Sequence, residues 1–263
     1  MHIFTVINNK GGVAKTSSVA NLGAYFSYLE KKTLIVDTDP QSNLTQHFDS
    51  ALEELQIDRT LYHAYVDFKE FGVKTEIPIY KINPFLYIIP ASNELASMEK
   101  ELATYNNNQG IMTKLLKQFK EHFEFCFIDC PPSLGFLTDN AVVACNSVII
   151  PIEASAFSYK GVDTIINYLE KLKLHNDLEF NLSGVFMSKF DVRESISEAV
   201  LSEVKDKFKH LMFNTQIRIN TDIKKAQANG EDIFVFAKNS NSAKDYADLA
   251  DEIIQRTGIK TTV

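Results

Sequence analysis

The chain has 263 residues, of which 45% are hydrophobic, and it carries a formal net charge of −7. This length supports one sizeable core, and the ten glycines and seven prolines argue against a long disordered tail. The acidic balance excludes a strongly basic nucleic-acid binder as a description of the whole chain, although it permits a local basic patch. We therefore expect a single globular domain over residues 1–263.

Three cysteines, Cys126, Cys130 and Cys145, show neither Cys-x-x-Cys spacing nor a neighbouring histidine cluster. Buried, reduced thiols in a cytosolic protein are the expected interpretation. The chain starts with an apolar strand pattern rather than a basic-then-apolar signal segment. No apolar run approaches the roughly 18 residues that a membrane span requires. We expect a soluble cytoplasmic protein.

Strand and helix patterns alternate along the chain. Apolar runs predict strands at residues 2–7, 33–37, 85–90, 125–130, 147–152, 182–187 and 213–219. Apolar residues at helical spacing predict helices at 16–29, 93–105, 111–123, a segment ending at 145, 161–174, 195–208 and 242–256. Ser242 is the expected cap of the last helix and Gly258 its stop, whereas residues 50–83 predict only a short helix and loops. The alternation indicates an α/β fold, a single doubly wound, mostly parallel sheet flanked by helices.

The stretch Lys10-Gly-Gly-Val-Ala-Lys-Thr16 lies between the first predicted strand and the first predicted helix. Such a loop presents backbone N–H groups and a helix N-terminus to an anion. Lys15 is expected to reach the β- and γ-phosphates of a nucleotide, and the Thr16 hydroxyl to hold Mg²⁺. The usual pattern G-x-x-x-x-G-K-S/T is only partly met, because Asn9 and Ala14 occupy its glycine positions.

Acidic residues follow two of the predicted buried strands, at the sheet edge where α/β proteins bind ligands. Hydrolysis of a nucleoside triphosphate needs a phosphate cradle, Mg²⁺, added positive charge and an oriented water. We assign Asp129 to Mg²⁺, which it would hold through the waters of the metal, Asp37 to the water shell of the metal and Asp39 to the attacking water. An ordinary strand-end carboxylate is the alternative for Asp129.

Lys10 lies five residues before Lys15, at the front of the loop. We do not expect both side chains to reach the same phosphates without strain. Lys10 is instead placed to reach the nucleotide of a neighbouring subunit, the role that an arginine finger plays in trans. The alternative is a solvated lysine.

The segments around these residues resemble the ParA/MinD ATPases, P-loop NTPases with a deviant Walker A loop. The resembling segments are Lys10–Thr16 with K-G-G-x-x-K-S/T, Asp37–Asn43 with D-x-D-P-Q-x-N, Ile128–Gly135 with D-x-P-P, Ser155–Gly161 with S-x-F-x-x-x-G, and Gly184–Arg193 with G-V-x-x-x-x-x-D-x-R. They stand in family order over roughly residues 1–255. The resemblance implies a nucleotide site formed by Lys10, Gly11, Gly12, Val13, Ala14, Lys15, Thr16, Ser17, Ser188 and Asn220. It also implies Lys10, Lys15 and Asp39 as catalytic residues.

Within this family the chain resembles the short ParA form, because no helix-turn-helix pattern precedes the first strand. ParA proteins bind ATP with Mg²⁺, form a nucleotide-sandwich dimer and coat double-stranded DNA without sequence preference. A ParB-like adaptor stimulates hydrolysis and releases them from the nucleoid. MinD-like membrane targeting is not expected, since the tail after Ile254 has no wide apolar face.

Two positions depart from the family pattern. Ala14 replaces a glycine, and a Cβ there costs about 1–2 kcal/mol if the backbone needs a positive φ. Residues Ile217-Arg-Ile-Asn220 stand where the family often has I-P-R-N, so the contacts to adenine are open at Arg218 and Ile219.

Between Lys189 and Lys225 the chain has eight basic and six acidic residues. Binding to DNA without sequence preference depends on contacts from such residues to phosphates. The candidates for DNA contact are Arg193, Lys205, Lys209, Arg218, Lys224 and Lys225. By charge alone, a solvated helix face is the alternative.

Three functions are compatible with the sequence. The first is an ATPase that partitions plasmids or chromosomes, and the second a ParA-like ATPase that positions a protein cargo on the nucleoid. The third is a nucleotide-gated binding protein that does not hydrolyse ATP. This third possibility is suggested by Ala14, which replaces a glycine of the loop.

Overall fold

The computed structural model describes residues 1–72, 75–102, 108–154 and 158–259. Seven strands of these residues form one sheet in the order β3-β4-β2-β5-β1-β6-β7. The strands are β1 (His2–Val6), β2 (Thr33–Asp37), β3 (Tyr80–Lys81), β4 (Leu86–Ile89), β5 (Phe125–Asp129), β6 (Ser147–Glu153) and β7 (Asn181–Ser188). Neighbouring strands are parallel, except that β3 pairs antiparallel with β4 at the edge. The predicted α/β fold with a mostly parallel sheet is confirmed.

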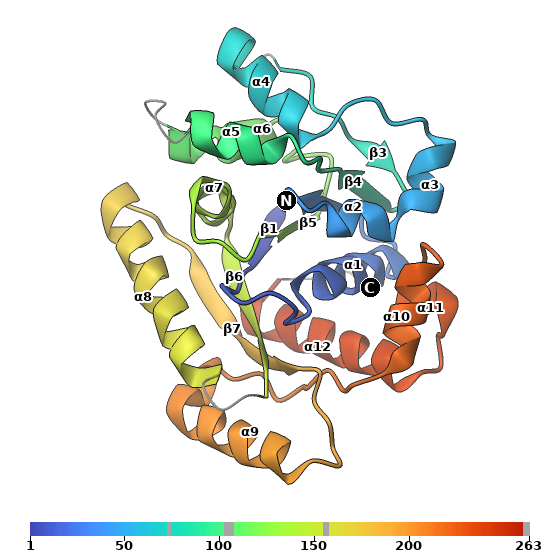
Figure 1. Ribbon diagram of the computed structural model, residues 1–263, viewed down its shortest axis with the longest axis vertical. Coiled ribbons are helices and arrows are strands. Elements are labelled where there is room, and N and C mark those ends of the chain that lie inside the picture. Colours follow the sequence, from blue (N-terminus) through green and yellow to red (C-terminus); the bar gives the residue numbers. More distant parts are fainter. Residues whose placement is uncertain (73–74, 103–107, 155–157, 260–263) are drawn as a thin grey trace.

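Helices cover both faces of this sheet (Figure 1). They are α1 (Lys15–Tyr28), α2 (Asn43–His47), α3 (Asp49–Glu54), α4 (Leu61–Phe71), α5 (Leu95–Leu102), α6 (Ile111–Lys117), α7 (Phe136–Ala144), α8 (Ser158–Asn176), α9 (Ser195–Phe208), α10 (Thr221–Ala228), α11 (Ile233–Phe236) and α12 (Asn241–Thr257). Two short 3₁₀ helices, Asn108–Gly110 and Lys209–Leu211, complete the described elements. Figure 1 shows α1 and α12 on one side of the sheet and α4 to α8 on the other.

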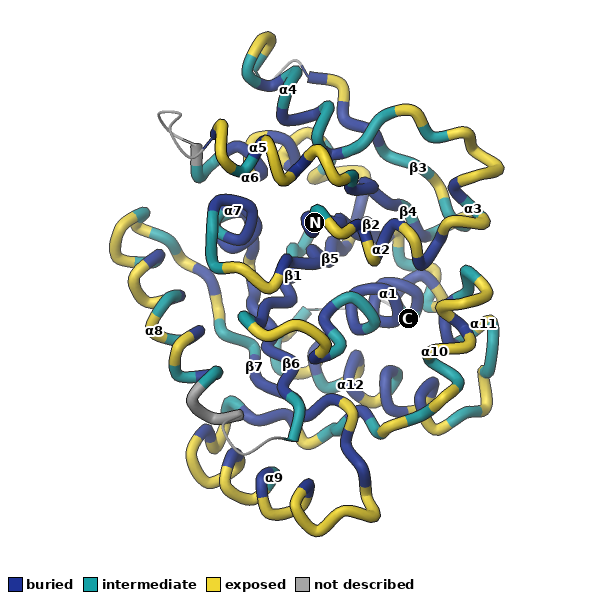
Figure 2. The backbone as a smooth tube through the Cα atoms, viewed as in Figure 1, coloured by how far each residue is buried: buried dark blue, intermediate teal, exposed yellow. Residues whose placement is uncertain are grey.

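Alternate residues of each central strand enter the cores on the two faces, because successive side chains of a strand point to opposite sides. In β5, Phe125 and Phe127 pack with residues of α1 and α12, whereas Cys126 and Ile128 pack with those of α6 and α7. A third cluster packs β6 and β7 against α8 and α9. Figure 2 shows that the central strands and α1 are largely buried, whereas α12 has one buried face. The sheet is therefore a rigid support from which loops emerge.

The carboxyl ends of β1, β5 and β2 lie next to one another. Val6 and Asp37 are both in register with Asp129. One edge of the sheet therefore carries both the loop that follows β1 and the aspartates that end β2 and β5. Ligand sites in parallel sheets lie at this edge.

Several predicted boundaries are wrong. Residues 213–219 form no strand but an irregular segment beside β7, with isolated bridges at Met212 and Arg218. The reason is that the Glu252 carboxylate accepts bonds from the backbone N–H groups of Asn214 and Thr215, which therefore do not join a ladder.

The cap of α12 is Ser240, whose hydroxyl oxygen accepts a hydrogen bond from the Ala243 backbone N–H, and Ser242 is buried in the first turn. Gly258 ends the helix in the left-handed conformation, as predicted. The helix predicted at 111–123 ends at Lys117, and residues 50–83 contain α3, α4 and β3. The predicted residues 103–105 and 155–157 lie outside the described residues.

All three cysteines are buried thiols, as predicted. Over the described part of the chain, no helix has the length and apolar character that crossing a membrane requires.

Candidate nucleotide site

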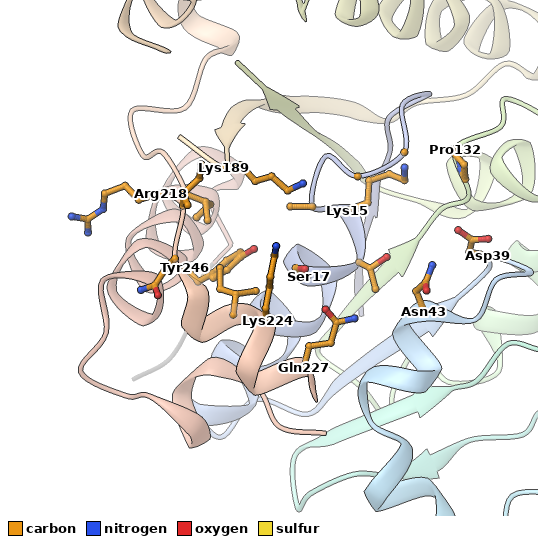
Figure 3. Close-up of a pocket in the computed structure, with 18 of the residues that line it drawn as sticks. Lys15, Ser17, Asp39, Asn43, Pro132, Lys189, Arg218, Lys224, Gln227 and Tyr246 are labelled. Carbon is orange, nitrogen blue, oxygen red and sulfur yellow. The ribbon is translucent and has the colours of Figure 1, made fainter. Parts of the chain in front are cut away.

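A cavity of about 510 Å³ opens at the carboxyl edge of the sheet, within the size range of about 300–1,000 Å³ typical of small-molecule sites. One wall is the loop and the first turn of α1, and the opposite wall comes from residues 217–227 and α12 (Figure 3). The lining residues are Gly11, Gly12, Ala14, Lys15, Thr16, Ser17, Asp39, Gln41, Asn43, Pro132, Lys189, Ile217, Arg218, Ile219, Asn220, Ile223, Lys224, Gln227 and Tyr246. Most of the predicted nucleotide-binding residues are thus brought together around one space.

Hydrogen bonds from the strands fix the loop between β1 and α1. The Asn8 side-chain amide donates to the Pro151 carbonyl of β6 at 2.6 Å, and its oxygen accepts the Lys10 N–H at 2.9 Å. The Ser188 hydroxyl, at the end of β7, lies 3.0 Å from the Val13 carbonyl oxygen. Ser188 and Val13 are buried behind the loop rather than in the cavity wall, so a direct nucleotide contact for either stays a prediction.

Ala14 occupies the position immediately before α1 and has φ 65°, in the left-handed region. A positive φ is uncommon outside glycine, because the Cβ crowds the following carbonyl oxygen, at a cost of about 1–2 kcal/mol. The conformation directs the loop into the helix, whose first N–H groups face the cavity. The backbone at Ala14 therefore does need a positive φ, the condition under which its Cβ costs free energy.

The two lysines of the loop differ in exposure. Lys15 is 7% exposed, and its ammonium donates to the Lys10 carbonyl at 2.9 Å. Burial lowers the pKa of Lys15, which the nearby Asp129 carboxylate opposes. Lys10 is exposed at the outer edge of the loop. Lys15 therefore belongs to the interior of the site, whereas Lys10 is exposed beside it and does not line the cavity.

Asp37 and Asp129 end neighbouring strands but have different surroundings. The Asp37 carboxylate accepts hydrogen bonds from the Asp39 N–H (3.0 Å), the Thr45 N–H (2.8 Å) and the Thr45 hydroxyl (2.7 Å). Both Asp129 oxygens are buried without a hydrogen bond of normal geometry. Burial raises the pKa of Asp37 to about 6. It raises that of Asp129 well above its ordinary range, an effect to which Asp37 adds.

Asp129 is buried beside the Thr16 hydroxyl and the Lys15 ammonium, which both favour its charged form. Such a carboxylate fits a bound cation, because a buried charge costs free energy unless it is paired. Asp129 and the hydroxyl of Thr16 are oxygen donors of the type that Mg²⁺ accepts. Asp37, with most of its lone pairs occupied, fits a contact through a water. The ion would supply neutralising charge to the phosphates of a nucleotide.

Asp39 lies in the cavity wall and accepts the Gln41 N–H at 2.9 Å. Figure 3 places it on the opposite side of Lys15 from Lys189 and Arg218. Its free oxygen is available to a water in the cavity, as its predicted role requires.

The wall opposite the loop is apolar with polar edges. Ile217, Ile219 and Ile223 lie there together with the ring of Tyr246, whose hydroxyl is 3.4 Å from that of Ser18. The Asn220 side chain caps α10 by accepting the Asp222 N–H, and it also borders the cavity. Such a surface suits the flat face of a base or a sugar.

The six predicted DNA contacts do not form one patch on a protomer. Figure 1 shows α9 at the lower edge and α10 at the right. Three of the six are paired with acids: Arg193 with Asp191, Arg218 with Asp245 and Lys225 with Asp222. Lys205 and Lys209 are exposed on α9 and the turn after it, and Lys224 borders the cavity. DNA contact at these residues stays a prediction.

Sequence reasoning missed several residues of the cavity wall. Lys189, Gln227 and Tyr246 line the cavity but were not assigned to a nucleotide. Lys189 lies two residues after the end of a predicted strand, a position that signals ligand contact in a parallel sheet. Tyr246 lies in a terminal helix, and no local signal connects it with the loop.

Comparison with known proteins decides the family. A family model described as an AAA domain matches residues 1–184. The sporulation initiation inhibitor protein Soj of Bacillus subtilis is 32% identical over 253 residues, which cover 95% of this chain and 97% of that protein. The chain belongs to the ParA/Soj family of partitioning ATPases.

A second relative of similar likeness is the chromosome-partitioning ATPase Soj of Treponema pallidum. It is 32% identical over 252 residues, with 96% of each chain covered. The predicted resemblance to ParA proteins is thus confirmed over nearly the whole length.

A solved structure with the same fold contains a bound nucleotide analog. Cobyrinic acid a,c-diamide synthase from Mycobacterium smegmatis, with bound ATP analog and magnesium, superposes with a TM-score of 0.80 at 25% identity. The match covers 99% of this chain and 98% of that one. Because a synthase shares the ParA/Soj fold, the fold alone does not assign a function.

Proposed function

We propose that this chain is an Mg²⁺-dependent ATPase that partitions DNA, with ATP-dependent dimerisation as its switch. The ATP-bound sandwich dimer binds double-stranded DNA without sequence preference at the nucleoid. A ParB-like adaptor stimulates hydrolysis and so releases the protein. Membership of the ParA/Soj family and the cavity at the loop support this proposal.

The contrast between the two loop lysines carries the proposal. Lys15 turns inward and suffices for a nucleotide bound by one subunit, whereas Lys10, on the same loop, is exposed and does not line the cavity. An exposed positive charge on this loop is of use when a second subunit brings its own nucleotide against it. ATP then completes a site shared by two subunits.

Hydrolysis follows from the same residues. Asp39 orients the attacking water, Lys15 and Lys10 stabilise the charge that develops on the phosphates, and Thr16 and Asp129 hold Mg²⁺. We expect slow turnover without the adaptor, because the partner subunit's charge and the water must both be in place.

Co-sedimentation with double-stranded DNA tests the proposal. Wild-type protein is incubated with Mg²⁺ and ATP, ADP or no nucleotide, at 50 and 200 mM salt, on two DNA sequences of equal length. We expect retention only with ATP, at equal levels on both sequences, with a steep loss at the higher salt. Equal retention in all nucleotide states refutes the switch.

Two variants sharpen this experiment. Lys10→Ala is expected to lower ATP-dependent retention by about tenfold, the effect of about 1.4 kcal/mol. Lys117→Ala removes the same charge from the exposed end of α6 and is expected to behave as wild type. Equal retention by wild type and Lys10→Ala contradicts the role in trans.

Ala14 favours a second candidate, a nucleotide-gated binding protein that does not hydrolyse ATP. Its left-handed backbone at φ 65° places a methyl group where the loop meets α1. Release of phosphate from ATP distinguishes the two functions. Background rates in the presence of both DNA and the ParB-like adaptor, together with ATP-dependent retention, favour this second candidate.

A further inference from the structure

The strongest unassigned feature of the site is Lys189, the residue that follows β7. Its neighbours fix its backbone on both sides. The hydroxyl of Ser188 lies 3.0 Å from the carbonyl oxygens of Val13 and Ile152. The backbone N–H of Phe190 donates to the Ile217 carbonyl, and its carbonyl accepts the Ile219 N–H. Lys189 is therefore held between the phosphate loop and the opposite wall of the cavity.

The side chain of Lys189 spans the space between these two walls. Its ammonium lies 3.9 Å from the position that a Cβ on Gly12 would take. Figure 3 shows the chain extending from the side of Arg218 toward Lys15. Since Lys189 lines the cavity, its methylene groups form part of the surface that a ligand would meet.

The backbone of Lys189 adopts φ 50°, in the left-handed region that a lysine rarely occupies. Such outliers persist where the surroundings over-determine them, and they cluster at ligand sites. Here the hydrogen bonds of Ser188 and Phe190 impose the turn, and the turn directs the lysine over the loop.

The ammonium of Lys189 also lies 3.9 Å from a carboxylate oxygen of Glu153. Both side chains are 43% exposed, and pairs of this kind are weak. Glu153 therefore holds the lysine beside the loop without removing its charge from the cavity.

We propose that Lys189 is a nucleotide-contacting residue that this chain supplies to its own site. Its aliphatic stem covers the nucleoside, and its ammonium lies over Gly12 beside the inner phosphates, as long basic side chains combine an apolar stem with a charged end. The inference rests on the proposed binding of ATP. It differs from the role of Lys10, which acts on the nucleotide of the other subunit.

The position of Lys189 predicts which nucleotides it affects. Asp39, assigned to the water that attacks the terminal phosphate, lies on the far side of Lys15 (Figure 3). Lys189 lies on the side of the apolar wall, next to Ile217 and Arg218. It therefore contributes equally to ATP and to ADP, which share the nucleoside and the inner phosphates.

Calorimetric titration with ATP and with ADP, both with Mg²⁺, tests the inference. Lys189→Met keeps an unbranched side chain of similar length and removes the charge, and we expect the Kd of both nucleotides to rise about tenfold. Lys189→Arg keeps the charge and is expected to stay within about threefold of wild type. The matched control Lys117→Met removes a distant exposed charge and is expected to leave both Kd values unchanged.

A glycine at the same position separates binding from folding. Because glycine adopts a positive φ freely, we expect Lys189→Gly to leave the thermal midpoint of the nucleotide-free protein unchanged or higher, while its Kd values rise as in Lys189→Met. If Lys189 had a structural role alone, Lys189→Gly would show the reverse result, a lower thermal midpoint and unchanged Kd values.

Each outcome decides the inference. Unchanged Kd values in Lys189→Met, or a loss confined to ATP, overturn it while leaving the proposed function intact. Failure of the wild-type protein to bind either nucleotide overturns the inference and the proposed function together.

Discussion

The strands β2 and β5 both end in an aspartate, and the two carboxylates differ in their hydrogen bonding. Asp37 and Asp129 are in register on neighbouring strands, and both are completely buried. Asp37 accepts three hydrogen bonds, whereas no hydrogen bond of normal geometry reaches Asp129. We infer that Asp37 organises the segment that follows it and that Asp129 is kept available for a cation.

The chain after each strand explains the difference. After Asp37 the backbone turns into α2, which places the N–H and the hydroxyl of Thr45 on the carboxylate. After Asp129 come Cys130 and then two prolines, Pro131 and Pro132, which have no N–H to donate. Equal residues at equal strand positions thus acquire different roles from the next few residues.

The largest effect is expected from Asp37→Asn. Its amide group would face donor N–H and hydroxyl groups, so at least one buried bond is lost and donors are brought together, at a cost of about 3 kcal/mol. Asp129→Asn disturbs no comparable set of hydrogen bonds and is expected to cost less than Asp37→Asn at the same pH. Urea denaturation of the nucleotide-free proteins compares the two. If both variants lose the same free energy of unfolding, the proposed difference between Asp37 and Asp129 is contradicted.

Thr45→Val removes the hydroxyl that connects Asp37 to the next strand. That hydroxyl donates to Asp37 and accepts the backbone N–H of Ala91 at 2.8 Å. Valine leaves the Ala91 N–H buried without a partner, so we expect a loss of about 2 kcal/mol in urea denaturation. Thr113→Val, on the exposed side of α6, is the matched control and should change little. A similar small change in both variants would show that the hydrogen bonds of the Thr45 hydroxyl do not stabilise the fold.

The shifted carboxyl groups predict a dependence on pH. Burial raises the pKa of Asp37 to about 6 and that of Asp129 well above its ordinary range. A raised folded-state pKa stabilises the fold below the unfolded pKa, near 4, and this stability is lost as the pH rises through the folded pKa. Relative to Asp129→Asn, wild-type protein without nucleotide should become less stable as the pH rises from 4.5 to 7.5. If the free energies of unfolding of the two proteins change equally with pH over this range, the prediction is contradicted.

The smallest effect is expected from Ala14→Gly. Glycine relieves the cost of a Cβ at φ 65° but loses more backbone freedom on folding, so the net gain is at most about 1 kcal/mol. Thermal unfolding measures this gain. A lower midpoint would indicate that the Ala14 methyl group stabilises the loop by packing.

Much of this arrangement was predictable from the sequence, since local patterns specify it. The run Phe125–Asp129 and the spacing of Val19, Leu22 and Phe26 gave the sheet, the first helix and the place of the loop. The resemblance of the loop and the acidic segments gave the family. These features depend on residues close together in the chain.

What could not be predicted depends on contacts between distant segments. The Glu252 carboxylate, on α12, accepts the backbone N–H groups of Asn214 and Thr215 and so interrupts the pairing of residues 213–219 with β7. Tyr246 reaches the cavity because α12 packs against α1, and Lys189 reaches Gly12 because β7 ends beside the loop. The different surroundings of Asp37 and Asp129 arise in the same way, from α2 and from the packing around β5.

We propose that Mg²⁺ binding depends mainly on Asp129 and that Asp37 contributes at most a contact through a water. The most direct test is the Kd of ATP measured with Mg²⁺ and with EDTA, in wild type, Asp129→Asn and Asp37→Asn. We predict that Mg²⁺ tightens binding to wild type and that Asp129→Asn, although folded, loses most of this gain, while folded Asp37→Asn retains the larger part. An undiminished effect of Mg²⁺ in Asp129→Asn would contradict the account.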